Sequence, residues 1–246
     1  MRPAELNRDR IVSLVPCITD SLLELDCADR IAGITRYCPA VPGAKVVGGI
    51  WDLDRDMIRS LSPDLVLVDP EENRPEDIEY LESALRVQRV QARTVEDSFK
   101  VMLSLKSLSA SLYEPSLTRG RRPGTDIEVV VPIWLEPLRF VGSGTYAADL
   151  LSNAGLVNRV EESGYPAIGE EGVIGCAERL KDAWVLRPTE PHKFGAEDVR
   201  QLSAMYPLAR GFRVVDGRDL FWYGARTAEA LDRLIELHAG LSREEP

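Results

Sequence analysis

The sequence predicts an α/β protein with two α/β lobes, each a small, mostly parallel sheet flanked by helices, joined by one long backbone helix. Three observations indicate this fold. Short apolar runs of strand length alternate with amphipathic helical segments. A long helical pattern stands near the middle of the chain. The segments before and after that pattern also follow the same order of strand, acidic loop and helix. The 246 residues are long enough for two such lobes.

The first lobe is expected over residues 1–93. Its opening strand, helix and strand are joined by short connections, which is typical of a βαβ unit and hence of a parallel sheet. Pro75 suits the first turn of a later helix. The expected strands are 10–16, 30–35, 64–68 and 87–90, and the expected helices follow Thr19 or Asp20 and span 54–61 and 75–85.

The linking helix is expected from Thr94 to about Glu114, within a connecting region 94–118. Thr94 can act as its N-cap, and Asp97 three residues later completes a pair like a capping box. Apolar residues recur at helical spacing until Pro115, which stops the run. Such a helix would be about 30 Å long.

The second lobe is expected over residues 119–246. A helix at 145–154 has Gly155 in the position after its C-cap, where a left-handed conformation is favoured. The other expected elements are strands at 126–132, 183–186 and 212–215 and helices at 170–179, 196–205 and 226–241.

Each lobe carries one acidic loop directly after a buried strand. Residues 64–73 and 182–191 follow the same pattern, and a helix comes after each. Ligands of open α/β sheets bind at the carboxyl ends of the strands. The repeat therefore predicts that Glu72 and Glu190 lie on opposite walls of one cleft between the lobes.

Composition excludes several classes of protein. The net charge of −10 argues against general binding of nucleic acid, which needs a basic surface. No apolar run is long enough to span a membrane. The first ten residues contain no apolar signal segment, so the chain as written is expected in the cytoplasm, or in the periplasm or at the cell surface if its N-terminus is truncated. The four cysteines are expected to be buried thiols, with a disulfide or metal pair among Cys17, Cys27 and Cys38 left open.

Enzyme signatures are largely missing from the sequence. It contains no Gly-x-Gly-x-x-Gly, Gly-x-Ser-x-Gly or Walker motif, so we expect no catalytic residues, no covalently bound cofactor and no enzyme activity. His192 stands two residues after Glu190 and is a candidate ligand contact or metal ligand, with an ordinary loop histidine as the alternative. His238, among charged residues of the last helix, is expected to be solvated.

Aromatic residues gather at the predicted loop tips rather than inside elements. For each ring taken alone, a place in the core is an open alternative, whereas the set as a whole favours a cleft. Exposed rings that line a cleft suit a flat or bulky ligand with apolar surface. The rings in question are Tyr37, Trp51, Trp134, Tyr165, Trp222 and Tyr223.

Several motifs give the sequence a family resemblance. The first half contains Arg10-Ile-Val-Ser-Leu-Val-Pro-Cys-Ile-Thr19, Val47-Gly-Gly49 and Leu61-Ser-Pro-Asp-Leu-Val-Leu67. The second half contains Val141-Gly142, Leu150 to Gly155, Tyr165-Pro166, Thr189-Glu190-Pro191 and Trp222 to Arg226. With these motifs the chain resembles the helical-backbone (class III) substrate-binding proteins, which serve importers of cobalamin, haem and ferric siderophores. Glu71-Glu72-Asn73 is similar to a cobalamin-binding-protein-like branch.

The resemblance implies a monomeric, non-enzymatic protein that holds a metal chelate between its lobes and delivers it to an ABC importer. A corrinoid is the first expectation, followed by haem or a ferric siderophore. It also implies that Asp56 and Glu171 dock on arginines of the membrane permease. With the acidic loops and His192 included, the expected ligand-binding residues are Pro16, Cys17, Tyr37, Cys38, Trp51, Glu72, Trp134, Tyr165, Glu190, His192, Trp222 and Arg226.

Two alternatives from other classes stay open. The first is a cytosolic metal-binding protein or enzyme that uses Glu72, Glu190, His192 and Cys38, since carboxylate, imidazole and thiolate all bind transition metals. The second is a regulatory interaction module that uses the acidic surface.

Overall fold

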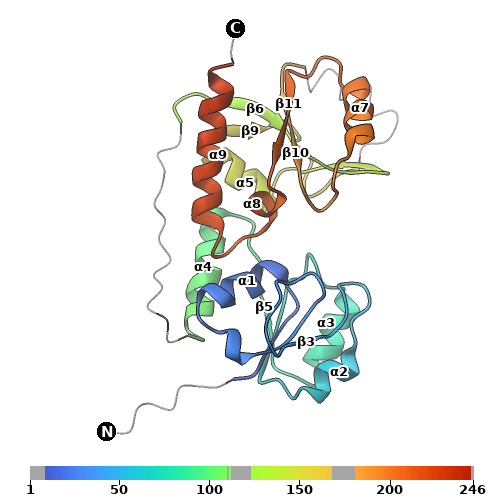
Figure 1. Ribbon diagram of the computed structural model, residues 1–246, viewed down its shortest axis with the longest axis vertical. Helices are drawn as coiled ribbons and strands as arrows, with labels where there is room; N and C mark the ends of the chain where they lie inside the picture. Colours follow the sequence, from blue (N-terminus) through green and yellow to red (C-terminus); the bar gives the residue numbers. More distant parts are fainter. Residues whose placement is uncertain (1–8, 110, 112–122, 168–180, 245–246) are drawn as a thin grey trace. The chain divides into compact units, whose positions relative to one another are not determined.

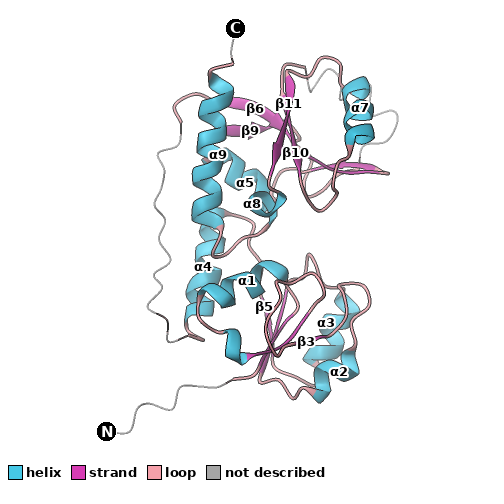
Figure 2. Ribbon diagram, viewed as in Figure 1, coloured by secondary structure: helices cyan, strands magenta, loops and turns pink. Residues whose placement is uncertain are grey.

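The computed structural model describes residues 9–109, 111, 123–167 and 181–244, and it is an α/β protein, as predicted (Figures 1 and 2). The chain divides into two compact units. The first unit consists of Met1–Ala92, Glu96–Ser116 and Tyr223–Ala225. The second consists of Arg93–Val95, Leu117–Trp222 and Arg226–Pro246. Each unit is therefore built from more than one stretch of chain.

The first unit contains a five-stranded parallel sheet in the order β3-β2-β1-β4-β5. Figure 1 shows α1 and α4 on one side of this sheet and α2 and α3 on the other. The strands are β1 Ile11–Ser13, β2 Ile31–Ile34, β3 Lys45–Val46, β4 Leu65–Val68 and β5 Val87–Arg89. The helices are α1 Pro16–Glu24, the short 3-10 helix Ala28–Arg30, α2 Arg55–Ser60, α3 Pro75–Glu82 and α4 Val95–Lys106.

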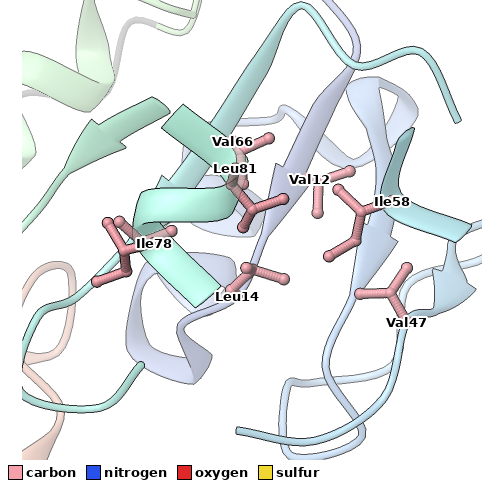
Figure 3. Close-up of a cluster of buried hydrophobic side chains, with 8 residues drawn as sticks. Val12, Leu14, Val47, Ile58, Val66, Ile78 and Leu81 are labelled. Carbon is pink, nitrogen blue, oxygen red and sulfur yellow. The ribbon is translucent and has the colours of Figure 1, made fainter. Parts of the chain in front are cut away.

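Both faces of this sheet are covered by helices because the central strands carry apolar side chains on both faces. Alternate residues of β1 and β4 point to opposite faces. One face packs against α2 and α3 in a fully apolar cluster (Figure 3). On strand β4 the intervening residues Leu65 and Leu67 are also 0% exposed, so the strand is apolar throughout, as is usual in parallel sheets. The cluster in Figure 3 consists of Val12, Leu14, Val47, Ile58, Val66, Val68, Ile78 and Leu81.

Local sequence signals fix where the helices of this unit begin. Pro16 and Pro75 open α1 and α3, where a missing N–H costs nothing. Asp54 caps α2, because its carboxylate accepts a hydrogen bond from the backbone N–H of Met57 at 2.8 Å.

The expected length of the linking helix is wrong. Helix α4 begins at Val95, directly after the expected cap, but it ends at Lys106 rather than near residue 114. Backbone hydrogen bonds of Leu108 and Ser109 reach back only three residues, which tightens and closes the last turn. The hydroxyl of Ser109 then donates to the carbonyl of Leu25, so serine side chains offer the backbone an alternative to more helix. Residues 112–118 of the expected connection lie outside the described residues.

The second unit contains a four-stranded parallel sheet in the order β11-β10-β6-β9, with α5 and α9 on one side and α7 on the other (Figure 1). An antiparallel hairpin, β7 with β8, follows β6 directly and was not predicted. The expected helix 170–179 lies outside the described residues. The strands are β6 Ile127–Val130, β7 Pro132–Leu135, β8 Leu138–Phe140, β9 Leu156–Asn158, β10 Trp184–Pro188 and β11 Gly211–Val215. The helices are α5 Tyr146–Asn153, α7 Ala196–Met205, α8 Gly217–Phe221 and α9 Thr227–Ser242.

Strand order confirms the internal repeat. Strands β9, β6, β10 and β11 of the second unit lie in the same order as β2, β1, β4 and β5 of the first. In the first sheet the chain adds β2 and β3 on one side of β1 and then β4 and β5 on the other, and in the second sheet it adds β9 on one side of β6 and then β10 and β11 on the other. The topological switch points therefore lie between β1 and β4 and between β6 and β10. The acidic loops follow β4 and β10, the strands on the other side of each switch point. They therefore occupy equivalent places in the two units.

The expectation that His238 is solvated is wrong. His238 is only 4% exposed, and its Nε2 donates a hydrogen bond to the carbonyl of Thr125 at 2.8 Å. Its position in α9 is in phase with the buried residues Leu231, Leu234 and Leu241, so the helix turns it inward. Across the described residues, no helix has the length and apolar composition needed to cross a lipid bilayer.

Candidate functional site

The acidic loop of the first unit is organised by Asp69, which sequence reasoning did not single out. Asp69 is 2% exposed, and its Oδ1 accepts a hydrogen bond from the N–H of Glu71 at 2.8 Å. Its own N–H donates to Oδ1 of Asn73 at 2.9 Å, and Nδ2 of Asn73 donates to the carbonyl of Leu14 at 3.3 Å. These bonds fix the loop that follows β4, with Glu72 half-buried within it, against the end of β1.

A short segment from late in the chain completes this loop. Tyr223 donates from its hydroxyl to Oδ2 of Asp69 at 2.7 Å, although the two residues are 154 positions apart. The following backbone N–H groups donate to buried hydroxyls, Gly224 to Ser98 at 2.7 Å and Ala225 to Ser21 at 3.0 Å. We call Tyr223–Ala225 the crossing segment. Tyr223 is only 4% exposed, so the expectation that it is a cleft-lining ring is wrong.

The cysteines of the first unit are free thiols, which excludes a disulfide among Cys17, Cys27 and Cys38. Burial raises the pKa of the Cys17 thiol well above its usual value, and the nearby carboxylates of Glu72 and Asp69 raise it further. Burial also raises the pKa of the half-buried Cys38, whose sulfur lies 3.1 Å from the hydroxyl of Thr35. Both side chains are therefore protonated at neutral pH and poorly suited to bind a metal as thiolates. Cys176 lies outside the described residues.

Two exposed rings stand on the loops after β2 and β3. Tyr37 is 54% exposed and Trp51 is 69% exposed, as expected for ligand-facing aromatics. Arg36 links the two loops, because its guanidinium donates to both carboxylate oxygens of Asp52 at 3.0 and 2.7 Å. Parallel strands end at one edge of the sheet, here called the carboxyl edge. The loops with Tyr37 and Trp51 therefore share this edge with Pro16, Cys17, Cys38 and Glu72.

In the second unit, His192 brings the acidic loop and the β7–β8 hairpin together. Its ring meets the rings of Trp134 and Phe194 edge to face, with centroids 5.3 and 4.7 Å away. Its Nε2 lies 3.2 Å from Oδ2 of Asp198, in the first turn of α7. Trp134 is 44% exposed and donates from Nε1 to the carbonyl of Glu136 at 3.1 Å.

Glu190 is half-buried and packs against the start of α8. Burial raises the pKa of its carboxyl, while a hydrogen bond from Trp222 and the charge of Arg226 act in the opposite direction. Gly217 lies against its backbone: a Cβ there would lie 2.5 Å from the carbonyl oxygen of Glu190. The N–H of Gly217 donates to the hydroxyl of Thr189 at 2.9 Å, which ties the loop to the helix.

This close approach predicts the effect of Gly217→Ala. The added methyl group must displace the backbone of Glu190, so we expect overpacking to lower the free energy of unfolding by about 1–3 kcal/mol. Gly240→Ala in α9 is the control, because nothing lies within 4 Å of a Cβ there. Urea unfolding of both variants measures the difference. Equal stability of the two variants would show that the contact at Gly217 is not restrictive.

The remaining expected ligand residues of the second unit also have defined surroundings. Tyr165 is 37% exposed, and its carbonyl accepts a hydrogen bond from Arg139 of β8 at 2.9 Å. Trp222 is half-buried at the C-cap of α8. Arg226 lies 4.0 Å from Asp219 and is partly buried.

The structure divides the described members of the expected set between the two units, and contacts join Trp134 with His192 and Glu190 with Trp222 and Arg226. Asp56 is exposed in the first turn of α2, whereas Glu171 lies outside the described residues. Within the described ranges, no three His, Cys, Asp or Glu side chains form a group that could hold a metal ion. Asp69 and Asp198 were missed, although Asp69-Pro-x-x-Asn73 after a buried strand is a turn signal that could have pointed to the first.

Comparisons with known proteins support the fold. No protein-family model matches the chain, and no curated protein matches it. Among solved structures, the periplasmic vitamin B12 binding protein BtuF of Vibrio cholerae has a TM-score of 0.77 at 16% identity, covering 96% of this chain and 98% of that one. The periplasmic heme binding protein HutB of Vibrio cholerae has a TM-score of 0.72 at 18% identity, covering 94% and 98%.

A periplasmic heme binding protein from Pseudomonas aeruginosa has a TM-score of 0.71 at 20% identity, covering 97% of this chain and 94% of that one. All three identities are low, so the likeness concerns the fold. It extends over nearly the full length of each protein, and it agrees with the motifs noted in the sequence. The chain therefore has the fold of the helical-backbone, class III substrate-binding proteins, as those motifs predict.

Proposed function

We propose that this protein binds a metal chelate without chemical conversion, with a corrinoid as the first candidate and haem or a ferric siderophore as the next. The proposal rests on one observation above all: exposed aromatic side chains stand at the carboxyl edge of the first sheet, Tyr37 and Trp51, and on the β7–β8 hairpin of the second unit, Trp134. Rigid rings of this kind suit the apolar faces of a large, flat ligand. The solved structures of similar fold that are named for vitamin B12 or heme support the same class of ligand.

A titration series tests this proposal. The purified protein is mixed with cobalamin, cobinamide, hemin, a ferric siderophore and free divalent metals, and its thermal unfolding is followed. Binding to the folded state stabilises it by about 2.7 kcal/mol at a ligand concentration of 100 times the dissociation constant. A saturable shift with one chelate would support the proposal. A shift with free metal alone would favour the metal-handling alternative, and no shift with any chelate would refute the proposal.

Replacing an exposed ring should weaken binding without unfolding the protein. Trp51→Ala removes a ring that is 69% exposed, so we expect little loss of stability and a roughly three- to tenfold weaker affinity for the chelate that binds. Leu103→Ala, on α4, removes a side chain that is 60% exposed and not at the carboxyl edge, and serves as the control. Absorbance titration measures both affinities. Equal affinity of the two variants would remove Trp51 from the site.

Delivery to an ABC importer is the second part of the proposal, and it requires a location outside the cytoplasmic membrane. The exposed carboxylate of Asp56 is the proposed contact in the first unit, with Glu171 as its counterpart. Asp56→Arg should weaken capture by a permease in detergent while leaving chelate affinity unchanged. Unchanged capture would remove this contact.

A further inference from the structure

Two closed loops carry the exposed rings of the first unit. The turn 35–38 carries Tyr37, and a 3.2 Å hydrogen bond from the N–H of its last residue to the carbonyl of its first closes it. The loop 47–54 carries Trp51, and a bond of 2.9 Å between its end residues closes it in the same way. Among the described residues, neither ring contacts another aromatic ring. The backbone of each loop is therefore held at its ends, while the rings stay open to solvent.

An ion pair joins the two loops directly beside these rings. Arg36 immediately precedes Tyr37, and Asp52 immediately follows Trp51. The guanidinium of Arg36 donates from Nη1 to Oδ1 of Asp52 at 3.0 Å and from Nη2 to Oδ2 at 2.7 Å. These bonds lower the pKa of the Asp52 carboxyl, so both partners are charged at neutral pH. A two-bond pair of this kind fixes orientation as well as distance, so each ring stands next to a residue that is tied to the other loop.

The backbone is shaped to hold this ion pair. The N–H of Gly49 donates to Oδ1 of Asp52 at 3.1 Å, and the N–H of Arg36 donates to the carbonyl of Gly48 at 2.8 Å. A Cβ at Gly49 would lie 2.7 Å from Oδ1 of Asp52 and 2.9 Å from Nη1 of Arg36. It would also lie 3.1 Å from Cε2 of the Tyr37 ring. Only a glycine leaves room here for the ion pair and the ring together.

Stability of the fold gives little reason for so closely fitted a pair. The side chains of Arg36 and Asp52 are 48% and 58% exposed, and solvent screens the attraction between charges in such a place. The pair therefore adds little to the free energy of unfolding. Its effect falls on the freedom of the two loops, which matters when a ligand has to find both rings in place.

We propose that Arg36 and Asp52 are positioning residues that hold Tyr37 and Trp51 at a fixed spacing before a chelate binds. This inference rests on the proposed function, because the chelate is the ligand that the rings would meet. It goes further by assigning the spacing of the rings to an ion pair that makes no bond to the ligand. Immobilising one free side chain on binding costs roughly two- to twelvefold in affinity. We therefore expect loss of the pair to weaken chelate binding about three- to tenfold.

The first test uses the protein without ligand. Asp52→Asn removes one charge of the pair, while its amide oxygen can still accept the bond from Gly49. We expect a larger amplitude of nanosecond motion of Trp51 in time-resolved fluorescence anisotropy. Because the chain has four tryptophans, Trp51→Phe identifies the part of the signal that comes from Trp51.

Glu82→Gln is the matched control for this test. It breaks another exposed two-bond pair, in which Arg89 donates to Glu82 at 2.8 and 2.9 Å and joins β5 to α3 rather than the loops with the rings. The control should leave the anisotropy unchanged. Both variants should keep a melting temperature within about 3 °C of the wild type, since both pairs are exposed.

The second test measures affinity by absorbance titration with cyanocobalamin, hemin and ferrichrome as probes. Asp52→Asn and Arg36→Met break the same ion pair, so the double variant should bind about as weakly as either single variant. Arg36→Lys keeps the charge but loses the two-bond geometry and should recover part of the affinity. In a protein that also carries Tyr37→Ala and Trp51→Ala, Asp52→Asn should have little further effect. Glu82→Gln should bind like the wild type.

The outcomes separate this inference from the proposed function. A wild-type protein that binds none of the three probes overturns both. If the wild type binds a probe and Asp52→Asn binds it as tightly as Glu82→Gln does, only the positioning role is overturned. An unchanged mobility of Trp51 in Asp52→Asn overturns that role as well. Additive losses in the double variant would show that Arg36 and Asp52 contact the ligand separately, which also contradicts positioning through the pair.

Discussion

Asp69→Ala is expected to lower the free energy of unfolding by roughly 3 kcal/mol, the largest single effect among the substitutions considered. The substitution removes the acceptor of two hydrogen bonds, from the hydroxyl of Tyr223 and from the N–H of Glu71. Tyr223 is 4% exposed, so its hydroxyl has little water to replace the lost partner and keeps only a long contact to the carbonyl of Val90 at 3.4 Å. A poorly satisfied buried donor costs about 1–3 kcal/mol. Urea unfolding monitored by circular dichroism measures the change.

A double-mutant cycle isolates the bond itself. Asp69→Ala and Tyr223→Phe are measured singly and together, and we expect a coupling energy of about 1–3 kcal/mol because both partners are buried. Glu79→Ala, an exposed carboxylate on α3, is the control and should change stability by less than about 0.5 kcal/mol. Additive effects of the two substitutions would contradict the view that this bond holds the crossing segment in the first unit.

Much of the fold could be predicted because its signals are local. Strands β4 and β10 are short apolar runs between polar loops, and the caps of α2 and α5, Asp54 and Thr145, are visible in the sequence. The repeated order of strand, loop and helix predicted two lobes of one plan, and the structure has the two acidic loops after equivalent strands, β4 and β10. Local pattern also placed exposed rings correctly at Tyr37, Trp51 and Trp134.

The parts that were missed depend on contacts between distant residues. The pattern around Trp222 and Tyr223 is the same for an exposed loop and for a buried segment, and only the acceptor at Asp69 decides between them. The early end of α4 depends on the carbonyl of Leu25, which accepts from Ser109. His238 has a polar side chain but stands on a buried helical face, where Thr125 satisfies its N–H. Hydrogen-bond partners far away in sequence leave no periodic signal.

The candidate site also combines features that local sequence signals predict with features that depend on contacts made only in the folded chain. Loop position alone identified Glu190 and His192, but it gave no reason to choose between a ligand contact and an ordinary histidine. Asp198, the partner of His192, is a common first-turn acid of a helix, and its position in the sequence is typical of a capping residue. In the structure it is both the cap and the partner of His192, because the loop after β10 turns the imidazole toward α7. The contact of Asp198 with His192, made in addition to its bond from Gly195, can be recognised only in the folded structure.

Stability is expected to fall at alkaline pH, and buried thiols and phenols in the first unit explain the direction. Burial raises the pKa of Cys17 above its ordinary value of 9.0 and that of Tyr223 above 10.0. The folded state therefore keeps both protons at pH values where the unfolded chain releases them. The stabilisation is complete below the unfolded pKa values and is lost as pH rises above them. Each such group contributes a slope of at most about 1.4 kcal/mol per pH unit.

The contributions of the two groups can be separated by substitution. Cys17→Ala should flatten the decline in the free energy of unfolding that begins near pH 9, and Tyr223→Phe should flatten the part that begins near pH 10. Tyr37→Phe is the control, because solvent already reaches that ring, which is 54% exposed. Urea unfolding at half-unit steps from pH 8 to 11 gives the slopes. If Tyr223→Phe and the wild type decline equally above pH 10, the phenol does not hold its proton in the folded state. The bond from Tyr223 to Asp69 would then be absent at alkaline pH, and the crossing segment would keep the hydrogen bonds of Gly224 and Ala225.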